Sequence, residues 1–537
     1  MTPRTSVLGV AFAEPAAPSR VLHDVTQHHT FAEIHFIAWQ RAPYLIAALL
    51  VHVLIGFVLA SLMLLQREAT LAPWMTVQAT APEPVPPVHD PPLPLDSEPT
   101  PDPEPVTTPS DLAEAEPTAW EEVGDPELNA VSPFESLFSN LAIGLGSDAG
   151  GQKGGPPGGR PRGGAEMEEA LGDALGWLAT HQNRAGYWDA DEFMLEDRWP
   201  QQPPSDGLGN PAVDVGVTGL ALLAFLGNGN TLDGGPYRDR VGRAVKWLLS
   251  VQRDDGLYGE EVGNSTLYNH AIAALAMSET YRLSARPPPL RPSVQSAAGL
   301  LMRARNPYGA WRYSLEPNGD NDTSVTGWIV FALQSAQDAG IAVDKTCFDG
   351  AAAWFDAMTD ARTGRTGYAM GEAGGGPGSY SARPHNETRF PPEKSESLTA
   401  VALLCRIFMT DTAKVRRWED HPDYEILARQ LGLLRARPPN GDGLGGGTDF
   451  YYWYYATYAL NQWGGQAWRD WERALGKALL PVQRRADPQD NFFGSWDPVD
   501  AWGEEGGRVY STAMCALMME VYYRYARVLG ADWRNER

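Results

Sequence analysis

The chain has 537 residues, three cysteines and a formal net charge of −24 at pH 7. Three scattered cysteines without a CxxC pair exclude a disulfide framework and a zinc finger, and the acidic balance excludes a nucleic-acid partner, which requires a basic face. Residues 68–165 hold sixteen acidic and three basic residues, so much of the negative charge belongs to one segment.

Residues 44–65, YLIAALLVHVLIGFVLASLMLL, are predicted to form a single transmembrane helix, because about 20 apolar residues span a hydrocarbon core of ~30 Å. More than forty residues precede this segment and no small-residue cleavage site closes it, which indicates a retained anchor. Arginines are concentrated before it, so we expect residues 1–43 in the cytoplasm and the rest outside, in the periplasm if the source is bacterial. The membrane is therefore an expected partner. His52 is the only ionisable residue of the span, either a neutral hydrogen-bonded imidazole or a proton-relay group.

Residues 66–165 are predicted to be a disordered, acidic linker rich in proline and glycine. The stretch at 81–106 cannot form a packed core, because proline removes backbone donors and like charges repel. It is expected to act as a semi-stiff tether. The stretch at 129–146 contains an apolar run with the character of a docking helix, and the glycine-rich stretch at 146–164 predicts a hinge.

From residue 166 onward an internal repeat predicts helical hairpins. Three stretches superimpose without gaps, WLATHQNRAGYW at 177–188, WLLSVQRDDGLY at 247–258 and LLMRARNPYGAW at 300–311, and looser copies lie at 351–368 and 479–496. The ungapped copies carry an apolar pair, then Gln or Arg, then Gly, then an aromatic ring. The glycine supplies a positive φ at a helix end, the ring folds back over the turn, and the Gln amide can bond loop or next-helix backbone groups.

A second, mostly apolar helical pattern follows each turn, at 214–226, 266–277, 322–333, 395–408, 453–463 and 508–525. Threonines recur in phase in five of these segments, and His270 takes the same phase in the second. Helices that are apolar on nearly all sides are buried. Six buried helices ringed by six amphipathic ones predict an all-α fold, an (α/α)6 toroid of helical hairpins, over residues 166–535.

The repeat W-L-x3-Q-x3-G-x-W resembles the QW motif of squalene–hopene cyclases and related triterpene cyclases, whose toroid is shared with protein prenyltransferase β subunits. The resemblance covers about residues 166–535. It implies the fold more strongly than an activity, because QW repeats stiffen the scaffold and perform no chemistry.

The stretch GDNDTSVTGW at 319–328 resembles the acidic D-x-D-D-T-A segment with which these cyclases protonate an alkene. An ungapped match places the final Asp on Asp322 and the proton donor on Asn321, whose amide cannot supply a proton. If the alignment is shifted by one residue, the proton donor falls on Asp322, but the position of the next Asp is then occupied by Thr323. Asp322 and Asp320 are the candidate catalytic acids. N-terminal capping of the inner helix is the alternative for Asp322 and for Asp214, which has the same phase in the first repeat.

The resemblance to prenyltransferases implies an Asp-x-Cys zinc site, but Cys405 and Cys515 lack an Asp two residues before them. We predict neither a metal site nor a cofactor. An (α/α) toroid also carries glycosidase or lyase chemistry, which uses paired carboxylates or a His/Tyr pair. Tyr268, Asn269 and the candidate catalytic His270 are the best residues for that reading, and a satisfied core histidine is the alternative.

The stretch DFYYWYYATY at 449–458 is the most aromatic of the chain. Its rings are predicted to line a ligand cavity or to fill the toroid axis. The predicted ligand-binding residues are Asp214, Tyr268, Asn269, Tyr452, Trp453, Tyr455 and Tyr510. The predicted function is a divergent, membrane-tethered toroid that binds a ligand or protein partner. The alternatives are an isoprenoid cyclase or transferase acting on membrane lipid, and a glycan-active enzyme.

Overall fold

The computed structural model describes residues 164–521, apart from positions 308, 372–374, 381–386, 411–413 and 441–445. The predicted cytoplasmic segment at 1–43, the anchor at 44–65, nearly all of the linker at 66–165 and the end of the toroid at 522–535 lie outside these residues. None of the helices that the described residues form has the length and apolarity needed to cross a bilayer.

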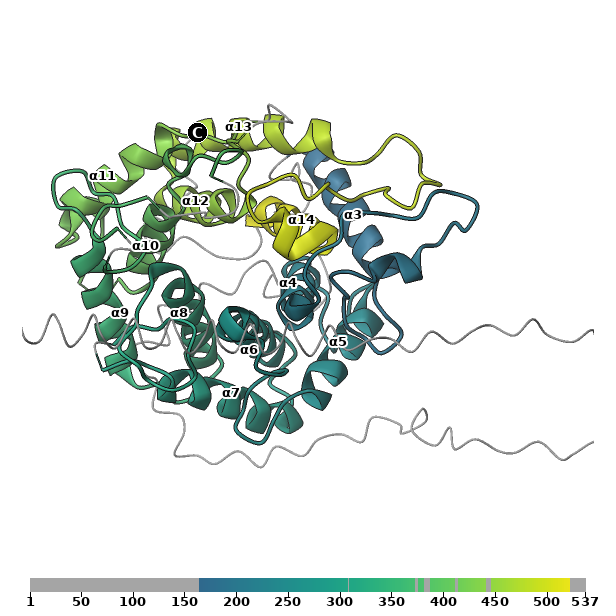
Figure 1. The fold of residues 1–537 in the computed structure, drawn as a ribbon, viewed down its shortest axis with the longest axis horizontal. Coiled ribbons are helices and arrows are strands. Elements are labelled where there is room, and N and C mark those ends of the chain that lie inside the picture. Colours follow the sequence, from purple (N-terminus) through teal and green to yellow (C-terminus); the bar gives the residue numbers. More distant parts are fainter. Residues whose placement is uncertain are drawn as a thin grey trace, which may run out of the picture. The chain divides into compact units, whose positions relative to one another are not determined.

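Twelve α-helices of the described residues alternate between an outer and an inner layer (Figure 1). The outer helices are α3 (Ala165–Thr180), α5 (Arg238–Ser250), α7 (Arg291–Arg303), α9 (Lys345–Met358), α11 (Tyr424–Arg435) and α13 (Gly465–Leu479). The inner helices are α4 (Asp214–Gly227), α6 (Thr266–Leu283), α8 (Thr323–Asp338), α10 (Ser397–Phe408), α12 (Phe450–Trp463) and α14 (Gly503–Met519). Short 3-10 helices lie in the connections, at Phe193–Glu196, Pro211–Val213, Gly263–Ser265, Pro288–Leu290, Pro392–Lys394, Trp418–Asp420 and Leu480–Val482.

The inner helices form a closed ring. Each packs against the next in chain order, and α14 packs against α4 (Figure 1). The predicted all-α toroid of helical hairpins is therefore confirmed over the described residues, and an open superhelix is excluded there.

Composition separates the two layers. In α4 every residue from Gly216 to Gly227 is buried, whereas α13 buries one stripe that includes Trp468, Trp471 and Leu475. A helix that is apolar on all sides needs neighbours all round, and an amphipathic one needs them on one side. The uniformly apolar helices therefore form the inner layer of the ring, and the amphipathic helices form the outer layer.

The Gln residue that recurs in the repeat joins one hairpin to the next. Gln182 Nε2 donates hydrogen bonds to the carbonyl of Gly186 in its own turn (2.8 Å) and to that of Arg240 on α5 (2.9 Å). Gln483 does the same across the seam of the ring, to Gly494 (2.9 Å) and to Ala170 on α3 (2.8 Å). The last hairpin is thus fastened to the first by the same pair of bonds that fastens the first hairpin to the second. In the third copy Arg305 replaces the Gln and donates to Thr346 Oγ1 at the start of α9.

The glycine of the repeat allows the turn to approach the next outer helix. Gly186 and Gly494 have φ of 109° and 96°. A Cβ at these positions would lie 2.3 Å from the Arg243 carbonyl oxygen and 2.2 Å from that of Asp173. Both the left-handed backbone and the close contact therefore require glycine.

The aromatic residue of the repeat closes the turn against its own hairpin. Trp188 Nε1 donates to the Leu178 carbonyl at 2.7 Å, and its backbone N–H donates to Thr218 Oγ1 on α4 at 2.9 Å. Trp311 and Trp496 make the equivalent bonds to Thr326 and Thr512. The threonines that recur in phase are thus acceptors for an otherwise unpaired, buried N–H group.

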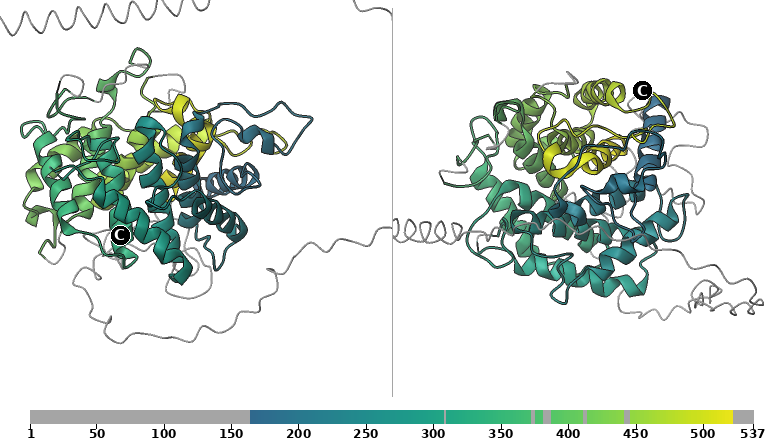
Figure 2. Two further views of the ribbon diagram at one scale, coloured as in Figure 1. Left: turned by 60° about the horizontal axis from the view of Figure 1, so that its bottom comes forward. Right: turned by 45° about the vertical axis from the view of Figure 1, so that its right-hand side comes forward.

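The first and last hairpins also touch through their long loops, which lie side by side at the seam (Figures 1 and 2). Asn491 Oδ1 accepts a bond from Trp199 N–H at 2.9 Å, and Asn491 Nδ2 donates to the carbonyls of Trp199 and Pro203. These loops reinforce the closure made by Gln483.

We predict that Gln483→Ala lowers the free energy of unfolding by about 1–3 kcal/mol, because two buried carbonyls lose their donor. Denaturant unfolding of the purified chain measures the change. Gln489→Ala is the matched control, since Gln489 is exposed in the same loop and should change stability by less than about 0.5 kcal/mol. Equal effects of the two substitutions would contradict the closure role of Gln483.

Candidate functional site

All six hairpins run the same way, so the N-terminal ends of the inner helices gather at one face of the ring. Polar residues are concentrated at these ends, where free backbone N–H groups attract oxygen atoms. Asp322 and Asp449 cap α8 and α12, with Oδ1 accepting bonds from Val325 N–H (2.7 Å) and Tyr452 N–H (2.9 Å). The capping role expected for Asp322 is confirmed.

Asp214 does not cap α4, so that expectation is wrong. Its Oδ1 accepts a bond from the backbone N–H of Ala190 at 2.9 Å, and its helix has no side-chain cap. The reason is that the long loop of the first hairpin turns back over the helix end and supplies a donor of its own. Asp214 therefore holds a loop in place rather than a helix terminus.

Three side chains from two different loops surround the Asp322 carboxyl group. Arg312 Nε lies 3.8 Å from Asp322 Oδ2, and the Tyr368 hydroxyl donates to the same oxygen at 3.4 Å. Tyr313 hydrogen-bonds Tyr368 through the hydroxyl groups. The Arg312 guanidinium lies 5.0 Å from the ring centroid of Tyr313 and 5.7 Å from that of Tyr368, within cation–π range.

Burial dominates the electrostatics of Asp322. The side chain is 0% exposed, and burial raises its pKa to about 7, although the Val325 N–H and the Arg312 charge pull the pKa down. A carboxyl group of this kind carries a proton for part of the time at neutral pH. It is nevertheless shielded from solvent, so no substrate atom can reach it in this conformation.

A chain of hydroxyl groups continues from this cluster across the ring. Tyr268 on α6 donates to Ser324 Oγ on α8 at 2.9 Å, and Ser324 Oγ lies 2.8 Å from the Tyr451 hydroxyl on α12. The Tyr451 ring meets that of Trp502 edge-to-face with centroids 6.1 Å apart. Residues from four hairpins thus converge at one end of the axis.

Below this polar layer the axis is filled with aromatic rings. Trp328 on α8 contacts Tyr454 and Tyr455 on α12, with centroid separations of 5.7 and 5.5 Å, and Phe331 lies 5.7 Å from Tyr455. Helices α8 and α12 both flank α10, so these contacts cross the interior. Of the two predicted roles for the aromatic stretch, filling the axis is the one these contacts show.

A solvent-accessible pocket of about 390 Å³ opens beside Arg312 and Tyr313. The pocket is lined mainly by hydrophilic side chains, which include those of Glu261, Asn264, Arg312, Tyr313, Asn318 and Asp320. Asp320, a predicted catalytic acid, lies exposed at this rim. Asn306 shapes the loop, because its Oδ1 accepts from the N–H groups of Asn318 and Gly319 and its Nδ2 donates to the Asp320 carbonyl.

His270 belongs to the scaffold. Its Nδ1 accepts a bond from Tyr258 N–H at 3.1 Å, as the threonines do in other hairpins, and its Nε2 lies 3.2 Å from the Ala297 carbonyl oxygen. Burial lowers the pKa of His270 to about 4, so it is neutral at physiological pH. Its neighbour Asn269 donates to the Ala212 carbonyl at 2.7 Å and ties α6 to the loop before α4.

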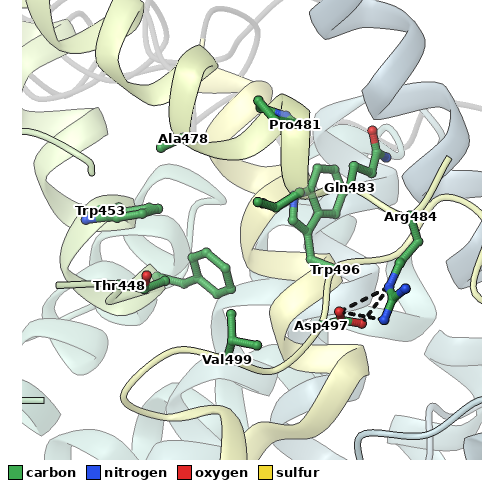
Figure 3. A pocket seen from close by; sticks show the side chains of 11 residues that line it. Thr448, Trp453, Ala478, Pro481, Gln483, Arg484, Trp496, Asp497 and Val499 are labelled. Atoms are coloured by element: carbon green, nitrogen blue, oxygen red, sulfur yellow. Dashed lines mark hydrogen bonds and ion pairs between the residues drawn. The ribbon is translucent and has the colours of Figure 1, made fainter. Parts of the chain in front are cut away.

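The other predicted ligand-binding residues are separated by the fold. The Tyr452 hydroxyl donates to the Arg437 carbonyl at 2.9 Å, away from the axis. Trp453 lines a separate pocket of about 350 Å³ between the start of α12 and the end of α13, beside the Arg484–Asp497 ion pair (Figure 3). Tyr455 and Tyr510 are buried, and their hydroxyl groups have no hydrogen-bond partner among the described residues.

One group of carboxylates was not predicted. Asp189, Asp191 and Asp214 offer oxygen atoms that all lie within 4.8 Å of one another, a set that could hold a cation. Burial and repulsion from Asp189 and Asp191 raise the pKa of Asp214 to about 7. The tyrosine hydroxyl of Tyr187 donates to Asp189 Oδ2 at 3.3 Å. Cys347, Cys405 and Cys515 are free, buried thiols.

Sequence reasoning missed Arg312, Tyr313 and Tyr368. A signal was present, because Arg312 and Tyr313 follow the repeat's Trp311 and Tyr368 ends the copy at 351–368. Their proximity to Asp322 depends on how two loops cross, which the repeat pattern does not encode.

No protein-family model matches this chain, and no curated protein matches it significantly. Three similar solved structures are an inactive variant of an alpha-1,6-mannanase from Salegentibacter in complex with alpha-1,6-mannotriose (10% identity, 66% of this chain and 98% of that chain, TM-score 0.45), a cellobiose 2-epimerase from Bacillus thermoamylovorans (12%, 66% and 97%, 0.44) and an alpha-amylase from Clostridium perfringens (10%, 68% and 99%, 0.39). Similarity of this size does not assign a family, and the cyclase resemblance stays a prediction.

We predict that wild-type stability falls relative to Asp322→Asn as pH rises from about 4 to about 7. The pKa of Asp322 is about 7 in the folded protein and about 4 in the unfolded chain. Between these two values the folded state binds more protons than the unfolded state, so the free energy of unfolding decreases as the pH rises. The full difference is at most about 4 kcal/mol. Denaturant unfolding at pH 4.5 and 7.5 measures it, with the exposed Asp320→Asn as control. A difference that does not change with pH would contradict the shift.

Proposed function

We propose that the toroid binds a glycan at the pocket beside Arg312 and Tyr313. The observation that carries this proposal is the lining of the pocket, in which amide, carboxylate and guanidinium groups stand around a partly exposed tyrosine ring. A hydroxyl-rich, uncharged ligand can pair with donors and acceptors at once, and its apolar faces can pack on the ring.

Two observations favour a glycan over an isoprenoid lipid. The axis, where a hydrocarbon chain would have to lie, is occupied by the contacts of Trp328 with Tyr454 and Tyr455. The carboxyl group that would start a cyclisation, Asp322, is inaccessible and engaged as a helix cap. A cyclase needs both a hydrocarbon cavity and a proton donor that faces it. If the predicted anchor at 44–65 spans a membrane, the toroid would meet glycans outside the cytoplasm.

A second candidate function is glycan cleavage at the carboxylates of the first hairpin. Burial and the neighbouring carboxylates raise the pKa of Asp214 to about 7, so this side chain can hold a proton at neutral pH, and a carboxylate oxygen of Asp189 lies within 4.8 Å of it. Retaining glycosidases hold two carboxyl groups ~5 Å apart. Asp214 is partly exposed, in contrast to Asp322.

Binding at the pocket predicts that Arg312→Gln and Tyr313→Ala each weaken glycan affinity by about 10-fold, since each removes a contact of roughly 1–2 kcal/mol. A glycan array that includes alpha-1,6-mannotriose identifies a ligand, and calorimetry measures its affinity for each variant. Arg291→Gln, an exposed change on outer helix α7, is the control and should bind as the wild type does. Retained affinity in both pocket variants would place the ligand elsewhere.

Cleavage predicts that wild-type protein shortens the bound oligosaccharide and that Asp214→Asn reduces the rate by at least about 100-fold, because the amide cannot donate a proton. Chromatography of the products measures the rate. Binding without products from the wild type would leave recognition as the function and reject the second candidate. A cyclised product from squalene or a polyprenyl substrate, formed by wild type and not by Asp322→Asn, would reject both.

A further inference from the structure

A groove lies where the chain enters the toroid. It has a volume of about 660 Å³ and runs between the start of α3 and the outer surface of α13. Its boundary includes Gly164, the first residue that the structure describes. Whatever precedes Gly164 therefore begins its path at this groove.

The groove combines an apolar floor with a basic rim. Met167 and Leu480 supply apolar surface, and Gly476 also lines the groove, with a Cβ at that position lying 3.6 Å from Met167 Cε. Arg469, Arg473 and Lys477 recur every four residues along α13 and form one row. Glu166 and Glu472 also line the groove, so its formal balance is positive by one charge, whereas the chain as a whole is strongly acidic.

The stretch at 133–145, PFESLFSNLAIGL, is apolar and is preceded by acidic residues, so it complements the apolar floor and basic rim of the groove. Ser132, Pro133 and Glu135 match the start of a helix, with a capping box and proline at the first position. Apolar side chains then recur at helical spacing, at 134, 137, 138, 141 and 145, and glycines follow the pattern. Acidic residues precede it, at 121, 122, 125 and 127. The sequence thus predicts a short amphipathic helix with negative charge at its N-terminal end.

The chain that connects residues 133–145 to the groove is short enough to favour contact between this stretch and the groove. Eighteen residues, 146–163, separate this stretch from Gly164. A glycine-rich chain of that length spans roughly 23 Å on average, and a helix of 13 residues is about 20 Å long. Such a tether gives an effective concentration in the millimolar range, so a modest contact suffices to hold the helix in place.

We infer that residues 133–145 bind the groove between α3 and α13 as an amphipathic helix. Phe134, Leu137 and Phe138 pack on Met167 and Leu480, and the acidic residues face the basic row of α13. This contact fixes the direction in which the linker leaves the toroid.

Hydrogen exchange of the full chain in detergent, read by mass spectrometry, tests this inference. The amides of 134–145 should exchange at least tenfold more slowly than those of 81–106. The protection should be lost in Leu137→Asp/Phe138→Asp and in Arg473→Glu/Lys477→Glu, while the inner helices exchange as in the wild type. Lys246→Glu, an exposed charge reversal on outer helix α5, is the control and should retain the protection.

Two outcomes would overturn the inference. The first is exchange of 134–145 at the rate of an unstructured peptide in the wild type. The second is protection that persists in Arg473→Glu/Lys477→Glu, which would mean that the helix binds the detergent, the membrane or another surface, such as the pocket lined by Trp453.

Discussion

The structure depends on one constraint, the fastening of each turn to the next outer helix. In the first, second and sixth hairpins a Gln amide bonds the following outer helix, and a glycine lets the two backbones meet. A chain of hairpins joined in this way has a free face at either end until the last meets the first. Gln483 bonds Gly494 in its own turn and Ala170 on α3, which brings the last hairpin onto the first. Both free faces are then covered, and burial of the six inner helices is complete.

Closure also determines where chemistry is possible. It brings the N-terminal ends of the inner helices to one face, where their unpaired N–H groups select oxygen-bearing side chains. It also brings α8 and α12 close enough for Trp328 to contact Tyr454, which fills the axis. Aromatic side chains therefore pack inside the ring, and the pocket beside Arg312 and Tyr313 lies at the polar end of the inner helices. A buried carboxyl group at the rim, Asp322, stabilises a helix end and is shielded from ligands.

The sequence predicts the ring well because its pattern is local and repeated. The glycines, the Gln residues and the phase of the threonines all follow from spacing. In three hairpins the structure gives the threonine the same role, as acceptor for the backbone N–H of the repeat's tryptophan. That role also explains His270, whose Nδ1 replaces a threonine oxygen. The site is less predictable, because Arg312 and Tyr368 reach Asp322 from loops of different hairpins. Asp214 shares the phase of Asp322 but not its function, since a long loop provides a different donor.

We propose that a hydroxyl-rich ligand binds at the rim and that no ligand enters the axis. A crystal structure of the protein grown with alpha-1,6-mannotriose, or with a better ligand from an array, tests it most directly. We predict sugar density in contact with the ring of Tyr313 and within hydrogen-bond distance of Arg312, with the Trp328–Tyr454 contact intact. Density for an apolar molecule between those two rings, with Asp322 turned toward it, would contradict binding at the rim alone.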